Sequence, residues 1–234
     1  STCCLSHNLT CRSCRVPFLP LSLVAITLFA TYAHAQPTLW NDSLPLPKGD
    51  ELSDVEGVQF RVIKARQPEV DGFNWLHGVA LEWHGNQLFA SFGHNSGKEN
   101  TASEVANYVV SGDDGKTWSD VRLIDDGSEP ILAVSHGVFL SHEQTLWAFQ
   151  GAFTGRMQEV HTRAYVFNDS TGGWQTKGVV VADGCWPMPE PQTMSDGNWI
   201  MAGLHVKEGV GGADNPAAVA ISYGDDFTKW DVVS

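Results

Sequence analysis

The sequence predicts an all-β fold that repeats a four-stranded unit about three times. Apolar and polar residues alternate over short runs, and glycine-containing turns separate these runs. Similar segments recur along the chain, starting at His77, at His136 and at Glu190. The first two begin 59 residues apart and the third begins 54 residues later, close to the length of a four-stranded propeller blade. The predicted blades cover approximately residues 73–126, 131–183 and 186–234.

One turn in the first repeat carries a specific set of side chains, Ser-Gly-Asp-Asp-Gly-Lys-Thr-Trp-Ser, beginning at Ser111. Asp113 can accept hydrogen bonds from the amides of its own turn, and Gly115 can adopt the left-handed conformation. Trp118 can fold back over the hairpin, and Thr117 completes the pattern. This pattern resembles the Asp-box, or BNR repeat, a structural turn in the β-propellers of the sialidase (neuraminidase) superfamily. The resemblance implies a ring of six or seven blades, of which this chain would be a fragment.

The strands of each repeat follow in a fixed order after its first segment. The second strands are expected over residues 87–92, 145–149 and 198–202. The third strands are expected over residues 104–111, 162–168 and 217–223, and a turn and a fourth strand follow each of them. Residues 55–65 are one further strand candidate. Residues 36–54, which contain three prolines between 37 and 50, are predicted to be an extended lead-in.

The N-terminal segment has the features of a signal peptide. Arg12 and Arg15 precede an apolar run and a small-x-small cleavage motif that ends at Ala35. We therefore expect residues 1–35 to be removed and the protein to be exported, to the periplasm or the extracellular space, without a membrane anchor. Four of the five cysteines lie in this segment, so Cys185 has no intrachain disulfide partner in the mature chain.

The charge of the chain excludes some classes of partner. The formal net charge is −13 at pH 7, which makes nucleic acid an unsuitable ligand. Nine tryptophans in an exported β protein suit the stacking of sugars, but we expect most of them to close hairpins and blade interfaces. The carbohydrate partner is what the resemblance to sialidases implies. No Cys-x-x-Cys pair remains after cleavage, and the glycine-rich run over residues 209–212 precedes no helix. The sequence therefore predicts neither a metal nor a cofactor.

The resemblance to sialidases extends to candidate catalytic residues. The segment His-Gly-Val-Ala-Leu places His77 where sialidases have an arginine that binds the substrate carboxylate. The segment around Glu190 resembles the one whose glutamate polarises a nucleophilic tyrosine, which implies that Glu190 is catalytic. A partly buried carboxylate on an inner strand suits general base catalysis. Glu99 and Glu104 are the nearest candidates for the acid, and neither aligns well enough to be assigned. These features imply a glycoside hydrolase that cleaves terminal linkages of acidic extracellular glycans.

A second resemblance indicates different chemistry. Ulvan lyases and related exo-acting rhamnosidases are propellers whose sites use histidines, with an arginine that neutralises the uronate in the lyases. His77 and His136 begin equivalent inner strands, so both should face the central channel. His94 and Arg156 follow the second strands of the same two blades and would bind substrate. β-Elimination needs a base, an acid and a cation, which these residue types supply. The alternative activity is a uronate-directed polysaccharide lyase, with His77, His136 and Glu190 as the catalytic candidates.

A third possibility is a propeller without catalytic activity that binds glycan or protein. Asp-box turns stabilise hairpins and do no chemistry themselves. A single histidine in a strand is more often a structural or surface residue than a catalytic one. The placement of His77 and His136 at equivalent positions is the argument against that interpretation.

Overall fold

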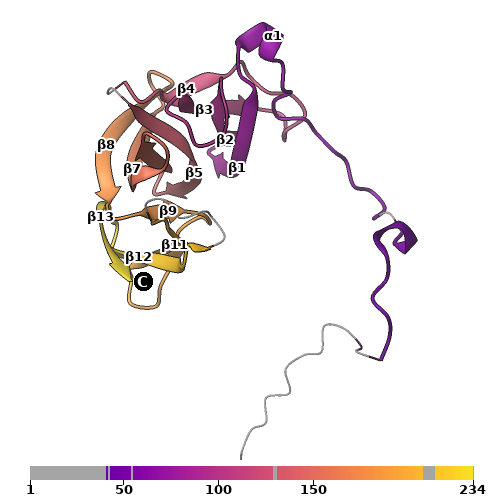
Figure 1. Ribbon diagram of the computed structural model, residues 1–234. Coiled ribbons are helices and arrows are strands. Elements are labelled where there is room, and N and C mark those ends of the chain that lie inside the picture. Colours follow the sequence, from indigo (N-terminus) through magenta and orange to yellow (C-terminus); the bar gives the residue numbers. More distant parts are fainter. Residues whose placement is uncertain (1–40, 42, 54, 129–130, 208–213, 234) are drawn as a thin grey trace, which may run out of the picture. The chain divides into compact units, whose positions relative to one another are not determined.

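The computed structural model describes residues 41, 43–53, 55–128, 131–207 and 214–233 (Figure 1). The chain divides into two compact units, Ser1–Glu56 and Gly57–Ser234. In the first unit the described residues hold one regular element, the 3-10 helix η1 (Gly49–Glu51). The predicted signal peptide lies outside the described residues. In the part of the chain that the structure describes, no helix is long and apolar enough to cross a bilayer.

The first sheet of the second unit has four antiparallel strands in chain order. They are β1 (Trp75–His84), β2 (Gln87–Asn95), β3 (Glu104–Ser111) and β4 (Arg122–Asp125). A single turn of helix, α1 (Pro68–Asp71), precedes this sheet. The segment 55–65, which was expected to be a strand, forms none among its described residues. Its apolar residues Val58, Phe60 and Val62 are exposed, because no neighbouring strand pairs with this segment in the described part of the chain.

The second sheet repeats the same antiparallel arrangement. Its strands are β5 (Leu132–His142), β6 (Thr145–Thr154), β7 (Gln158–Asn168) and β8 (Gly173–Val181). Two-residue hairpins join β1 to β2 and β5 to β6, with His84 opposite Gln87 and His142 opposite Thr145. The two sheets therefore share strand order and hairpin length, as the repeat in the sequence predicts.

The third sheet differs because its inner strand is divided. Its strands are β9 (Cys185–Pro187), β10 (Gln192–Thr193), β11 (Trp199–His205), β12 (Ala217–Tyr223) and β13 (Asp226–Val233). Both β9 and β10 pair with β11, and residues 188–191 bulge out between them. Glu190 lies in this break, flanked by Pro189 and Pro191, which have no N–H to donate.

This division corrects the alignment of the third repeat. Trp186 stands opposite Leu204 of β11, as His77 stands opposite Gly93 of β2. Trp186 therefore occupies the position in the third sheet that His77 occupies in the first. The alignment of the three repeats had placed Glu190 at this position, but Glu190 comes four residues after Trp186 in the chain.

The three sheets follow one another as consecutive blades of a partial propeller (Figure 1). The first strand of each sheet contacts the first strand of the next, so β1, β5 and β9 line the inner side. The last strands, β4, β8 and β13, lie on the outer side. The predicted all-β fold of about three four-stranded blades is confirmed.

The hydrophobic core lies between the sheets. Between the first and second sheets, Phe89 meets Phe139 edge to face, with ring centroids 6.5 Å apart. Between the second and third, Phe149 meets Trp230 in the same way at 5.5 Å. All four rings are buried. Because burial of an aromatic side chain contributes on the order of 2–3 kcal/mol, these rings hold the sheets in a fixed relative position.

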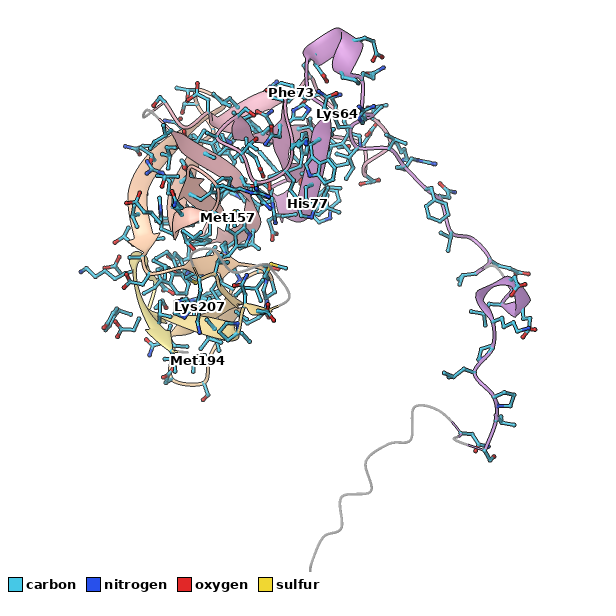
Figure 2. All side chains as sticks on the ribbon, viewed as in Figure 1. Lys64, Phe73, His77, Met157, Met194 and Lys207 are labelled. Atoms are coloured by element: carbon cyan, nitrogen blue, oxygen red, sulfur yellow. The ribbon has the colours of Figure 1, made fainter. Side chains whose placement is uncertain are left out.

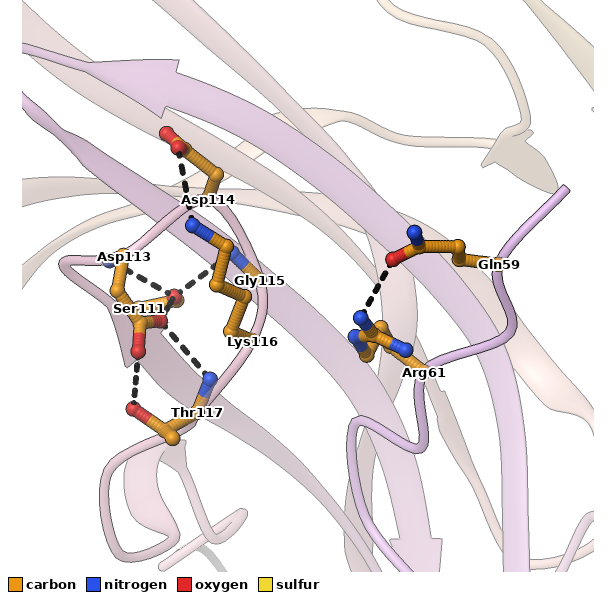
Figure 3. A network of polar contacts seen from close by, with 8 residues as sticks. All are labelled: Gln59, Arg61, Ser111, Asp113, Asp114, Gly115, Lys116 and Thr117. Atoms are coloured by element: carbon orange, nitrogen blue, oxygen red, sulfur yellow. Dashed lines mark hydrogen bonds and ion pairs between the residues drawn. The ribbon is translucent and has the colours of Figure 1, made fainter. Parts of the chain in front are cut away.

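The turn that begins at Ser111 has the hydrogen bonds its sequence predicts (Figure 3). Asp113 accepts from the backbone N–H of Thr117 at 2.8 Å and from the Thr117 hydroxyl at 2.7 Å. These bonds, together with one from the Ser111 hydroxyl, lower the pKa of Asp113 to about 2. Gly115 is left-handed, with φ of +75°, and Trp118 packs against the first sheet. The hydrogen bonds of this turn therefore stabilise the β3–β4 connection.

Candidate functional site

Three aromatic rings form a row along the inner side of the propeller, one from each sheet. His77 is near the start of β1 (labelled in Figure 2), His136 is in β5, and Trp186 is in β9. The ring centroids of His77 and His136 are 4.7 Å apart, and those of His136 and Trp186 are 5.1 Å apart. The sequence predicted only that both histidines face the central channel; the structure brings their rings into contact and adds a tryptophan.

Glycines on the neighbouring sheet make room for these rings. A Cβ atom on Gly78 would lie 2.0 Å from the ring of His136. A Cβ atom on Gly151 would lie 2.6 Å from the ring of Trp186. No side chain fits at either distance, so both positions require glycine. Gly78 also has a φ of +65°, which other residues rarely adopt.

Hydrogen bonds on both sides fix the tautomer of His136. The Ser135 hydroxyl donates to the carboxylate of Glu104, so it accepts from Nδ1 of His136, 3.0 Å away. The indole N–H of Trp186 donates to Nε2 of His136 at 3.3 Å. The ring is therefore neutral, with its proton on Nδ1. Burial, and secondarily the nearby His77, lowers the pKa of His136 to about 4.

His77 is more accessible and has a carboxylate partner. Its Nδ1 lies 3.2 Å from Oε1 of Glu99, in the β2–β3 connection. The His77 side chain is 50% exposed and the Glu99 side chain 38% exposed. A carboxylate on Nδ1 orients the ring and favours the acceptor tautomer at Nε2, the arrangement that a general base requires. Glu99, which the sequence left unassigned, thus lies at the site.

Farther along the inner strands, two carboxyl groups from different sheets approach each other. Glu82 of β1 is half-buried, and Glu190 from the break between β9 and β10 is exposed. Burial, together with the charge of Glu190 and a hydrogen bond between the two side chains, raises the pKa of Glu82 to about 7. Below pH 7 one carboxyl is therefore protonated beside a second one. Pairs of carboxyl groups in which one is protonated and the other is ionised are typical of acid–base catalysis.

His94 lies on the opposite face of the first sheet from His77. It follows Gly93, the partner of His77, and successive residues of a strand point to opposite faces. Its ring is 1% exposed, is stacked on Phe73 at 3.7 Å and has Nδ1 3.0 Å from the amide of Asn107. Burial lowers its pKa to about 4, and the residue lines a separate cavity of about 580 Å³. The structure does not bring His94 into the row of rings.

Arg156 is exposed in the turn between β6 and β7, beside Met157 (labelled in Figure 2). The end of β6 that precedes this turn pairs with the beginning of β5, where Leu132 stands opposite Thr154. Arg156 is therefore at the same end of the second sheet as His136. Its guanidinium is accessible to a negatively charged ligand.

Sequence reasoning missed three residues of the site. Ser135 and Trp186 complete the hydrogen bonds of His136, and Glu82 pairs with Glu190. One signal could have revealed Trp186: its partner Leu204 lies six residues after Asn198, just as Gly93 lies six residues after Gln87. Counting from the hairpin would have aligned Trp186 with His77.

No protein-family model matches this chain, and no curated protein matches it in sequence. Solved structures do match its fold. A family 117 glycoside hydrolase of the marine bacterium Zobellia galactanivorans aligns with a TM-score of 0.54 and 14% identity, over 74% of this chain and 59% of that one. A Hadza microbial sialidase aligns with a TM-score of 0.50 and 15% identity, over 71% and 39%. An α-L-arabinanase of Penicillium chrysogenum aligns with a TM-score of 0.50 and 15% identity, over 68% and 48%.

These neighbours define the fold of the chain as that of the β-propeller glycoside hydrolases. At identities of 14–15% the likeness concerns the fold. The chain spans between 39% and 59% of the length of these three structures.

Proposed function

We propose that this chain forms part of an exported glycoside hydrolase that cleaves terminal linkages of an acidic glycan. The observation that carries the proposal is the pair of carboxyl groups on Glu82 and Glu190, of which Glu82 has its pKa raised to about 7. Protonated Glu82 would donate its proton to the leaving oxygen, and Glu190, its hydrogen-bond partner, would take a proton from the attacking group. The fold shared with glycoside hydrolases supports this proposal.

Export and domain organisation are part of the same proposal. Residues 1–35 would be the signal peptide and residues 36–54 the lead-in, with the propeller over 55–234. The turn at Ser111 would be an Asp-box with a structural role, and its hydrogen bonds support that assignment. Cys185 is buried and free, which suits a protein that needs no disulfide.

A uronate-directed lyase is the second candidate, and the pair of His77 and Glu99 favours it. Nε2 of His77 would remove the proton next to the uronate carboxylate and pass it to the leaving oxygen as the C–O bond breaks and the double bond forms, with Glu99 holding the ring. Arg156, exposed at the same end of the second sheet as His136, would neutralise the carboxylate of the substrate. His136 would position His77 through ring contact, because its own Nε2 is bonded to Trp186.

The test is turnover of the whole chain on sialosides and on uronate- or rhamnose-bearing polysaccharides. Reducing sugar and near-ultraviolet absorbance are read together, because elimination leaves an absorbing double bond and hydrolysis does not. Hydrolysis predicts reducing ends without absorbance and loss of activity in Glu190→Gln and Glu82→Gln. The matched control is Glu69→Gln, an exposed glutamate on α1 outside the site.

Two results would contradict the hydrolase. Absorbance that rises with the reducing ends and is lost in His77→Ala, with Glu190→Gln tolerated, would identify the lyase instead. Sugar binding without turnover on any substrate, unchanged in Glu190→Gln, would identify a binding propeller.

A further inference from the structure

A cluster of three ligand-type side chains lies at the hairpin end of the propeller, between the second and third sheets. We propose that His142, Glu143 and Asp225 bind a divalent transition-metal ion of the zinc class and that this ion joins the two sheets. One imidazole nitrogen and two carboxylate oxygens of these residues lie within 4.8 Å of one another. His142 ends β5, six residues after His136, so the cluster is about 20 Å along the strand from the candidate active site.

The ring of His142 provides the main evidence for a ligand. Its Nε2 is buried and has no hydrogen-bond partner among the described residues. This atom nevertheless lies 3.4 Å from Oδ1 of Asp225. In a tetrahedral zinc site with bonds of about 2.0–2.2 Å, two ligand atoms are separated by about 3.4 Å. The nitrogen and the oxygen are thus spaced like two corners of a zinc tetrahedron.

Trp199 supports the cluster from the third sheet. Its indole N–H donates to Oδ1 of Asp225 at 2.9 Å, and its ring meets that of His142 edge to face at 5.0 Å. An outer hydrogen bond of this kind holds a ligating carboxylate in place. An imidazole with two carboxylates suits zinc-class ions better than magnesium or calcium, which prefer oxygen ligands alone. Three protein ligands leave the fourth position to water.

The boundary between the first and second sheets has a similar histidine–aspartate pair, which can be compared with the proposed metal site. His84 ends β1, and its Nε2 lies 3.8 Å from Oδ1 of Asp169 in the β7–β8 turn. Gly85 follows it, at the hairpin position that Glu143 holds in the second sheet. This pair therefore has the histidine and the aspartate without the third ligand, and zinc is expected to bind at His142 and not at His84.

The experiment measures zinc stoichiometry and thermal unfolding of the whole chain. Accessible cysteines are alkylated first, because the four N-terminal ones would bind zinc themselves. We expect one equivalent of bound zinc and a rise of several degrees in Tm on zinc addition. Glu143→Gln and Asp225→Asn should lose both effects. Glu143 is exposed, so its substitution leaves packing intact, and His84→Gln is the control that should retain both.

Three outcomes would overturn the proposal. The alkylated chain could bind no zinc. It could bind zinc with the same stoichiometry in Glu143→Gln and Asp225→Asn as without substitution. It could lose the bound equivalent in His84→Gln while both other variants keep it. None of these results bears on the hydrolase, because the cluster shares no residue with the proposed catalytic pair.

Discussion

The indole N–H of Trp186 donates to Nε2 of His136 across the boundary between the second and third sheets. The other nitrogen of this ring is linked through Ser135 to Glu104, which belongs to the first sheet. One neutral imidazole therefore connects all three sheets. Protonation of His136 would break its bond to Trp186, since both ring nitrogens would then be donors.

Acid should destabilise the protein through His136. The unfolded chain binds a proton on this residue below about pH 6.5, while the folded chain does so only below about pH 4. The free energy of unfolding should therefore fall as pH decreases through this window, by roughly 3 kcal/mol from this group. In urea titrations, His136→Gln should show a smaller loss between pH 7 and pH 4. An unchanged pH dependence would mean that another group, such as His94, accounts for the loss.

Gly78→Ala should disrupt the row of rings. The added methyl group would overlap the ring of His136, and the backbone is left-handed there. We expect a loss of at least about 3 kcal/mol in the free energy of unfolding, measured by chemical denaturation. Gly85→Ala is the matched control, because Gly85 is also left-handed and has nothing within 4 Å of its Cβ position. It should lose only about 1 kcal/mol, and equal losses would refute a packing role for Gly78.

Glu190→Gln should lower the pKa of Glu82. Removal of the neighbouring charge takes away one cause of the raised value, while burial remains. The pKa of Glu82 should drop below 7 and stay above the ordinary value, as measured by carbon NMR of the side-chain carboxyl. If Glu82 is the acid, the alkaline limb of the pH–rate profile of the unsubstituted protein should lie near the Glu82 pKa of about 7. Glu69→Gln should leave both measurements unchanged. If the pKa of Glu82 is the same in Glu190→Gln as without substitution, the two carboxyl groups do not interact.

Asp113→Asn should weaken the β3–β4 turn. The carboxylate accepts two hydrogen bonds from Thr117, and its pKa is lowered to about 2. Its contribution to stability is present above about pH 3.8 and is lost as pH falls through about 2. At pH 7 the variant should therefore have a lower Tm than Asp114→Asn, which removes the neighbouring exposed carboxylate. Equal values of Tm for the two variants would argue against a structural role for Asp113.

The sequence was sufficient for the features that depend on local patterns. Alternation and turn chemistry predicted the three sheets, and repeat equivalence placed His77 and His136 on equivalent inner strands, where the structure brings their rings into contact. The placement of His94 failed because the prediction did not use the register: a residue next to the partner of His77 must point to the other face. Trp186 was missed because the inserted residues 188–191 shift the third repeat out of alignment. The pairing of Glu82 with Glu190 joins sheets distant in the sequence, and no local pattern records it.

The two prolines around Glu190 have a consequence for how its carboxylate is held. A residue in a strand owes its position to the ladder of hydrogen bonds, and Glu190 lies where that ladder is interrupted. Pro189 and Pro191 fix one backbone dihedral on each side of it, and Pro191 also restricts the backbone of Glu190 itself. The two prolines reduce the number of conformations that this segment can adopt in the unfolded chain, so less entropy is lost when the carboxylate is set in place.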